Sequence, residues 1–269
     1  MGKNRPKIGL ALGSGGFRGL AHIGVIKVLE RNNIPIDYIA GSSIGALIGA
    51  FYADCRDIKK IEEIALKTDW KMGVSIFDLG RHGGLVKGKK IENLIKKWLG
   101  HTCFEHIKIP IGVVATDLST GQELVVTKGN LVKAIRASFS VPLIFEPIVF
   151  QGKLLADGGL VDPVPDGVVK NMGADKVIAV NLENGNFKQA LHRKKVSFLK
   201  VALRSYNILA WHLAETSMSE ADVIISPEVG GDDIVGFGKF FDHKNVKKII
   251  RTGEIAAEKE LPKIKKLVF

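Results

Sequence analysis

Cysteine is scarce in this chain, with two in 269 residues, and Cys55 and Cys103 do not form a CxxC pair. A disulfide framework needs an even set of closely spaced cysteines, and a structural zinc site needs a cluster of them with histidine. Both are excluded, so we expect a reducing, cytoplasmic compartment. We also expect no metal and no cofactor.

Long hydrophobic runs are missing too. The uncharged stretch 38–53 is bracketed by Asp37 and Asp54 and falls short of the roughly 20 residues that a membrane span needs. The apolar run 8–12 is too short for the core of a signal peptide, and Gly13 ends it. We therefore expect no transmembrane helix and no signal peptide.

Acidic residues are outnumbered, 28 against 39 Lys and Arg, which gives a net charge of +11. Residues 188–204 and 239–269 carry this whole excess between them. Such a surface faces phospholipid headgroups or nucleic acid, or is simply solvated. No nucleic-acid-binding motif is present, so we expect no nucleic acid partner. Peripheral contact with an anionic membrane is one hypothesis.

Short apolar runs alternate with amphipathic segments along the chain. Strands are expected at 7–12, 36–40, 111–115, 123–127, 177–181 and 223–226, and helices at 20–32, 44–53, 57–67, 89–98, 131–137 and 198–214. This alternation predicts a three-layer α/β/α sandwich with a largely parallel central sheet. Without repeats or a Pro/Ser-rich linker, one domain over 1–269 is expected, with motifs in about 8–170 and a basic helical part at 188–269.

The segment Gly41-Ser42-Ser43-Ile44-Gly45 lies between an expected strand and an expected helix, the context of a nucleophile elbow. Its glycines have a physical reason, because a turn this tight leaves no room for Cβ atoms beside the serine. Ser43 would then project at the carboxyl end of the sheet, where the next helix begins. The segment predicts a serine nucleophile.

A second strand-to-helix connection is Gly13-Ser14-Gly15-Gly16-Phe17-Arg18-Gly19, whose backbone N–H groups can converge on an anion. A dinucleotide fingerprint would need glycine at Arg18, and a P-loop would need Gly-Lys at positions 18 and 19. Neither nucleotide motif fits. We expect an oxyanion hole beside Ser43 instead.

A third motif is Asp157-Gly158-Gly159, which alone would be a tight turn. In this order, the three motifs resemble the glycine-rich loop, GxSxG elbow and DGG motif of the patatin-like phospholipase family. The block from Ala137-Ser138 to Pro147 and residues 115–121 resemble that family as well. The resemblance runs from Gly13 to about Pro165 and is only general after residue 170.

This resemblance implies serine-dependent hydrolysis of acyl esters of lipids or phospholipids, through a Ser-Asp dyad and an acyl-enzyme. Ser43 would be the nucleophile and Asp157 the general base. We expect the oxyanion to be held by backbone N–H groups of Gly15, Gly16, Phe17 and Ile44, with Gly13, Arg18, Gly41, Gly45, Gly158 and Gly159 in support. A carboxylate with a pKa near 4 is a weak base, so an apolar setting, such as residues 144–150, has to raise it.

Three alternatives stay open. A Ser-Asp-His triad could use His192, His212 or His243, although Ser43 follows only the second expected strand, earlier than in α/β-hydrolases. An acyltransferase of the same chemistry would pass the acyl group to an acceptor other than water. A catalytically silent lipid-binding module is the third alternative.

Several residues have two interpretations. Arg18 either anchors a substrate phosphate or pins the glycine-rich loop, and residues 138–150 either line an acyl-chain groove or form core strands. Asp117 is expected in a turn or cap, and His22 is expected to pack near the site. The segment 70–79 is a candidate lid or lipid-facing flap.

Overall fold

The computed structural model describes residues 5–67, 84–100, 103–183, 197–230 and 242–269. Its central sheet has the strand order β10-β9-β1-β2-β4-β8-β7, with β5 paired to β4. The bounds are β1 Ile8–Leu12, β2 Tyr38–Ser42, β4 Ile111–Asp117, β5 Glu123–Val126, β7 Ile148–Phe150, β8 Lys153–Asp157, β9 Lys176–Val180 and β10 Val223–Ile225. A two-stranded sheet joins β3 (Gly84–Val86) to β6 (Leu143–Phe145).

The pairing directions divide the central sheet in two. The pairs from β10 to β4 are parallel, whereas β5 and β8 run antiparallel to β4, and β7 runs antiparallel to β8. Ser42 pairs with Val114 and Asp157 pairs with Ala115. The last residues of β2 and β8 therefore lie on either side of β4 at adjacent positions.

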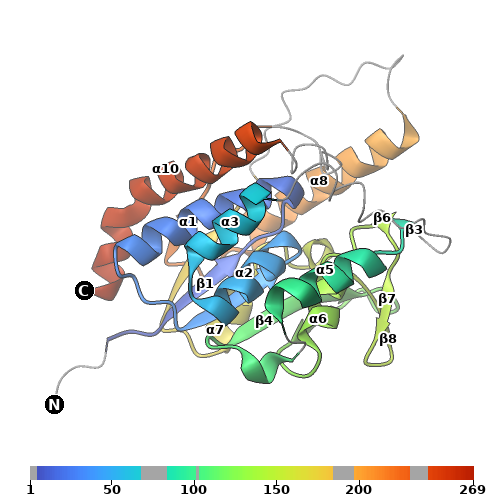
Figure 1. Ribbon diagram of the computed structural model, residues 1–269, viewed down its shortest axis with the longest axis horizontal. Coiled ribbons are helices and arrows are strands. Elements are labelled where there is room, and N and C mark those ends of the chain that lie inside the picture. Colours follow the sequence, from blue (N-terminus) through green and yellow to red (C-terminus); the bar gives the residue numbers. More distant parts are fainter. Residues whose placement is uncertain (1–4, 68–83, 101–102, 184–196, 231–241) are drawn as a thin grey trace.

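Helices cover both faces of the sheet (Figure 1). They are α1 Leu20–Arg31, α2 Ile44–Cys55, α3 Ile58–Lys67, α5 Lys89–Leu99, α6 Leu131–Ser138, α7 Asp166–Asn171, α8 Phe198–Ser217 and α10 His243–Val268, with 3-10 turns η1 Gly16–Gly19, η2 Phe104–His106 and η3 Gly158–Leu160. In β1, Leu10 and Leu12 join the larger core with α1 and α2, and Ala11 joins the smaller core with α7. This alternation produces the three layers, as the sequence predicted.

The main differences from the expected elements are one shifted strand and several short strands. The strand expected at 36–40 is found at Tyr38–Ser42, because the Asp37 carboxylate binds the backbone N–H of Ile8 before pairing begins. Strands β3 and β8 were not foreseen, and β6 and β7 were expected only in the core-strand interpretation of residues 138–150, since three to five residues are too few to show a period. In the described ranges, no helix combines the length and apolar character needed to cross a membrane.

Candidate active site

The turn from β2 into α2 holds Ser43 in a backbone conformation that L-residues rarely adopt, with φ 54° and ψ −120°. Glycine is required two residues before and two residues after Ser43. A Cβ at Gly41 would lie 2.5 Å from the backbone N of Ala46, and one at Gly45 would lie 2.0 Å from the carbonyl oxygen of Leu12. The strained turn thus fixes the serine at the carboxyl end of the sheet.

Ser43 and Asp157 meet directly. Ser43 Oγ donates a hydrogen bond to Asp157 Oδ2 at 2.6 Å, and the backbone N–H of Ser43 donates to Ser138 Oγ at 2.8 Å. The other carboxylate oxygen of Asp157 accepts from the backbone N–H of Gly159 at 2.8 Å and from Tyr206 Oη at 3.2 Å. The carboxylate therefore has one oxygen on the serine and one held by two other donors.

Asp157 is fully buried, and burial raises the pKa of its carboxyl to about 6. Hydrogen bonds from Ser43, Gly159 and Tyr206 oppose this rise in pKa, while the nearby charge of Glu183 adds to it. The pKa moves in the direction that a base for a serine hydroxyl needs.

The glycine-rich loop packs against the start of α2. A Cβ at Gly19 would lie 2.2 Å from Ile44 Cγ1, so only glycine allows η1 to approach α2 this closely. Gly15 and Gly16 have φ values of 147° and 56°, which also favour glycine. The end of η1 thus lies against Ile44, the first residue of α2, which directly follows Ser43 in the chain.

Arg18 pins this loop. It is buried, its Nη2 donates to Glu183 Oε2 at 2.7 Å, and its Nε donates to the carbonyl oxygen of Gly15 at 3.1 Å. Ser14 Oγ donates to the other oxygen of Glu183 at 3.1 Å. The structure thus favours the pinning interpretation of Arg18.

His22 lies beneath the same loop. Its Nε2 is 2.8 Å from the carbonyl oxygen of Gly13, and burial lowers its pKa to about 4. The neutral ring therefore donates from Nε2 to that carbonyl. Nδ1 is buried and has no hydrogen-bond partner among the described residues. His22 packs close to the site, as expected.

Of the three histidines considered for a triad, two lie away from Ser43 and Asp157 and one lies outside the described residues. His212 and His243 are exposed, and neither is among the hydrogen-bond partners of Ser43 or Asp157 within the described ranges. His192 and the candidate lid at 70–79 lie outside the described residues.

Two other expectations can be compared with the structure. Five apolar residues of segment 138–150 are buried in the larger core, as its core interpretation predicted, although Leu143 and Val149 are exposed. Asp117 ends β4 and accepts from the backbone N–H of Ser119, which makes it the turn residue that was expected.

Sequence reasoning missed two side chains at the site. Glu183 follows β9, and its place just beyond a buried strand was a signal that could have singled it out. Tyr206 lies within the long helix α8 and carries no local signal. In the part of the chain that the structure describes, no group of three His, Cys, Asp or Glu side chains is arranged to hold a metal ion.

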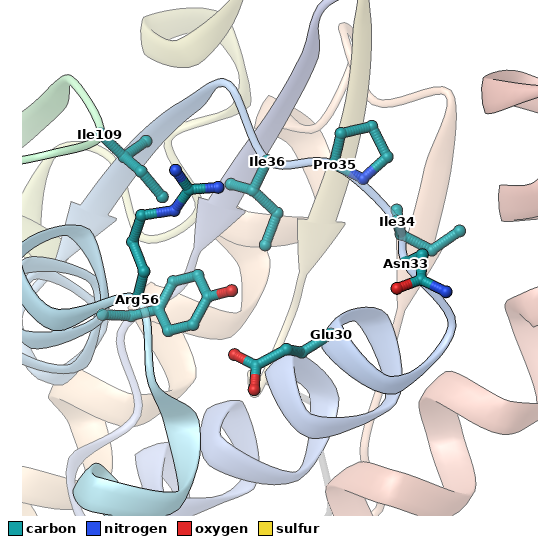
Figure 2. Close-up of a pocket in the computed structure, with 8 residues that line it drawn as sticks. Glu30, Asn33, Ile34, Pro35, Ile36, Arg56 and Ile109 are labelled. Carbon is teal, nitrogen blue, oxygen red and sulfur yellow. The ribbon is translucent and has the colours of Figure 1, made fainter.

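A cavity of about 270 Å³ lies at the opposite, amino end of the strands. Figure 2 shows Glu30 and Arg56 facing the space beside Ile36. Tyr52 lines it too, and burial together with the nearby charge of Glu30 raises the pKa of its hydroxyl. Since β2 separates this cavity from Ser43, it is not part of the dyad site.

Known proteins resemble this chain in sequence and in fold. An NTE family protein of Mycobacterium tuberculosis is 36% identical over 77% of this chain, which spans 59% of that relative's length. A lysophospholipase of Scheffersomyces stipitis is 36% identical over 65% of this chain and 12% of its own. VipD from Legionella pneumophila has a similar fold, with a TM-score of 0.53 and 14% identity over 96% of this chain and 67% of its own. The family profile described as "Patatin-like phospholipase" matches residues 10–167. The chain belongs to the patatin-like phospholipase family.

Proposed function

We propose that this protein hydrolyses acyl esters of lipids or phospholipids through an acyl-enzyme on Ser43, with Asp157 as general base. The 2.6 Å hydrogen bond from Ser43 Oγ to Asp157 Oδ2 carries the proposal, because a base must reach the proton that it removes. Family membership supports it.

The reaction follows in two steps. Asp157 takes the proton of Ser43 as Oγ attacks the ester carbonyl, and the carbonyl oxygen becomes an oxyanion. Backbone N–H groups of Gly15, Gly16, Phe17 and Ile44 stabilise this charge. Collapse expels the alcohol, which receives the proton from Asp157. Water, activated by the same carboxylate, then releases the acid from Ser43.

The names of relatives favour a lipid substrate. One relative is called a lysophospholipase and another, from Drosophila melanogaster, neuropathy target esterase. We infer that the acyl chain of a phospholipid or lysophospholipid is the group transferred to Ser43.

The test is hydrolysis of a lysophospholipid and of a diacyl phospholipid in heavy-oxygen water, with products identified by mass spectrometry. We expect free fatty acid carrying the heavy oxygen, and none with Ser43→Ala. Transfer of the acyl group to an added alcohol in preference to water would indicate an acyltransferase. No turnover with any ester would contradict the proposal.

We further propose that the protein contacts the surface of an anionic membrane, and α8 is the best-supported contact. Phe198 and Leu209 are 83% and 69% exposed, and Val201 and Ile208 lie on the same outward face. Lys200 is exposed in the first turn of the helix, and the sequence of α8 has no acidic residue before Glu215. An apolar helix face with basic neighbours suits the boundary of an anionic bilayer.

Vesicle pelleting tests this contact, using phosphatidylcholine with and without phosphatidylglycerol. We expect binding to need phosphatidylglycerol, to weaken with salt, and to fall by about tenfold in Leu209→Ser, because an exposed leucine loses its burial in the bilayer. Val149→Ser is the control, since Val149 is equally exposed, at 71%, on β7. Equal effects of both substitutions would contradict a role for α8.

A further inference from the structure

Helix α8 lies outside residues 10–167, which match the family profile, yet it reaches the dyad. Its buried face is formed by Leu203, Asn207, Ala210 and Ala214. Tyr206 lies at the edge of that face and donates from Oη to Asp157 Oδ1 at 3.2 Å. A segment that carries none of the three motifs thus touches the carboxylate that they position.

The space for this hydroxyl is built into the DGG motif. A Cβ at Gly159 would lie 2.9 Å from Tyr206 Oη and 3.0 Å from both Asp157 Oδ1 and Ser14 Oγ. The second glycine of the motif therefore leaves room for the Tyr206 hydroxyl beside the carboxylate. The same residue supplies the backbone N–H that shares Oδ1 with Tyr206.

We propose that Tyr206 is a positioning residue of the reaction, whose hydroxyl holds Asp157 Oδ1 so that Oδ2 stays directed at Ser43. Two donors on Oδ1 prevent the carboxylate from rotating, and Oδ2 is left to accept the serine proton. This inference rests on the proposed function and adds a residue to it from the part of the chain beyond the family profile.

The charged groups around the carboxylate determine the sign of the expected effect. Glu183, which follows β9, raises the pKa of Asp157 by its charge, and Arg18 of η1 is bound to Glu183. His22 of α1 is neutral above about pH 4. The hydrogen bond from Tyr206 lowers the pKa of Asp157. Burial and the two carboxylates raise the pKa of Tyr206 well above its usual value, so its hydroxyl stays protonated and donates.

The experiment is the pH dependence of kcat and KM for a soluble ester, p-nitrophenyl butyrate, with the full chain and Tyr206→Phe. Loss of the hydroxyl should raise the pKa of Asp157, so the acidic limb of kcat should move from about pH 6 upward by about one unit. At pH values below this limb, kcat of Tyr206→Phe should be about tenfold lower than that of the wild type, while KM stays within about twofold.

Tyr52→Phe is the matched control, because it also removes a phenol hydroxyl close to a carboxylate, at the other end of the sheet. Its acidic limb should coincide with that of the wild type. A Tyr206→Phe profile equal to that of Tyr52→Phe would overturn the positioning role while leaving the dyad in place. Absence of turnover in the wild type would instead be a failure of the proposed function.

If Tyr206→Phe does not fold, 3-fluorotyrosine at position 206 keeps the shape of the side chain and donates a stronger hydrogen bond. The acidic limb should then move to lower pH, because a stronger donor stabilises the charged carboxylate. An unmoved limb would overturn the proposal.

Discussion

At each end of the central sheet a tyrosine hydroxyl lies near a carboxylate: Tyr206 donates to Asp157 at one end, and Tyr52 lies near Glu30 at the other. Asp157 is fully buried and also accepts from a serine in a strained turn. Glu30 is only half-buried and lines a cavity at the amino end of the strands. Of these two carboxylates, only the fully buried one adjoins a serine in a strained turn.

The largest expected effect is a loss of activity on substitution at the end of the sheet that holds Ser43 and Asp157. Ser43→Ala and Asp157→Asn should each lower ester hydrolysis by about a thousandfold or more, since each removes one half of the nucleophile–base pair. Measured with p-nitrophenyl butyrate, the double variant should be no slower than either single one. Additive losses would show that the two side chains do not act as a unit.

The next largest effect is expected on stability, from replacing a glycine in the turn around Ser43. Gly45→Ala should destabilise the protein by about 3 kcal/mol or more, because the new Cβ would lie 2.0 Å from the carbonyl oxygen of Leu12. Gly167→Ala is the control. Gly167 lies in α7, with nothing within 4 Å of a Cβ there, so alanine should stabilise the helix by about 0.5–1 kcal/mol. Urea unfolding measures both, and equal effects would refute the account of the elbow.

A smaller effect concerns stability against pH. The folded-state pKa of Asp157, about 6, exceeds its unfolded value near 4, so the stability linked to its protonated form is complete below about pH 4 and is lost as pH rises through 6. Asp157→Asn does not titrate. Relative to the wild type, it should gain about 2–3 kcal/mol of unfolding free energy between pH 4 and pH 8. Urea unfolding at both pH values tests this, and a constant difference would contradict the raised pKa.

The smallest effect is expected at the amino end. Tyr52→Phe removes a hydroxyl near Glu30 and should change the unfolding free energy by about 1 kcal/mol or less. Its kcat for p-nitrophenyl butyrate should equal that of the wild type. A large fall in kcat would mean that the two ends of the sheet are coupled.

The motifs of the candidate site could be predicted because local backbone geometry dictates them. Gly41 and Gly45 are required by the turn around Ser43, and Gly19 by the approach of η1 to α2. The Gly41 constraint is local, against Ala46, whereas Gly45 meets Leu12 and Gly19 meets Ile44 on the neighbouring strand-to-helix connection. For those two glycines the motif pattern carried the prediction. The three-layer architecture could be predicted equally well, from the alternation of strands and helices along the chain.

Glu183 and Tyr206 could not be predicted in the same way. Glu183 meets Arg18 across 165 positions, and Tyr206 meets Asp157 across 49, because of how β9 and α8 pack. No residue spacing encodes those contacts. Strand β8 was missed because it is short, although it places Asp157 beside β4.

The most direct test of the central claim is labelling by a fluorophosphonate probe, followed by intact mass and peptide mapping at several pH values. The account predicts one adduct on Ser43, a rate that rises about tenfold per pH unit to a plateau above about pH 6, and strongly slowed labelling in Asp157→Asn. No adduct on Ser43, or labelling indifferent to Asp157, would contradict the dyad.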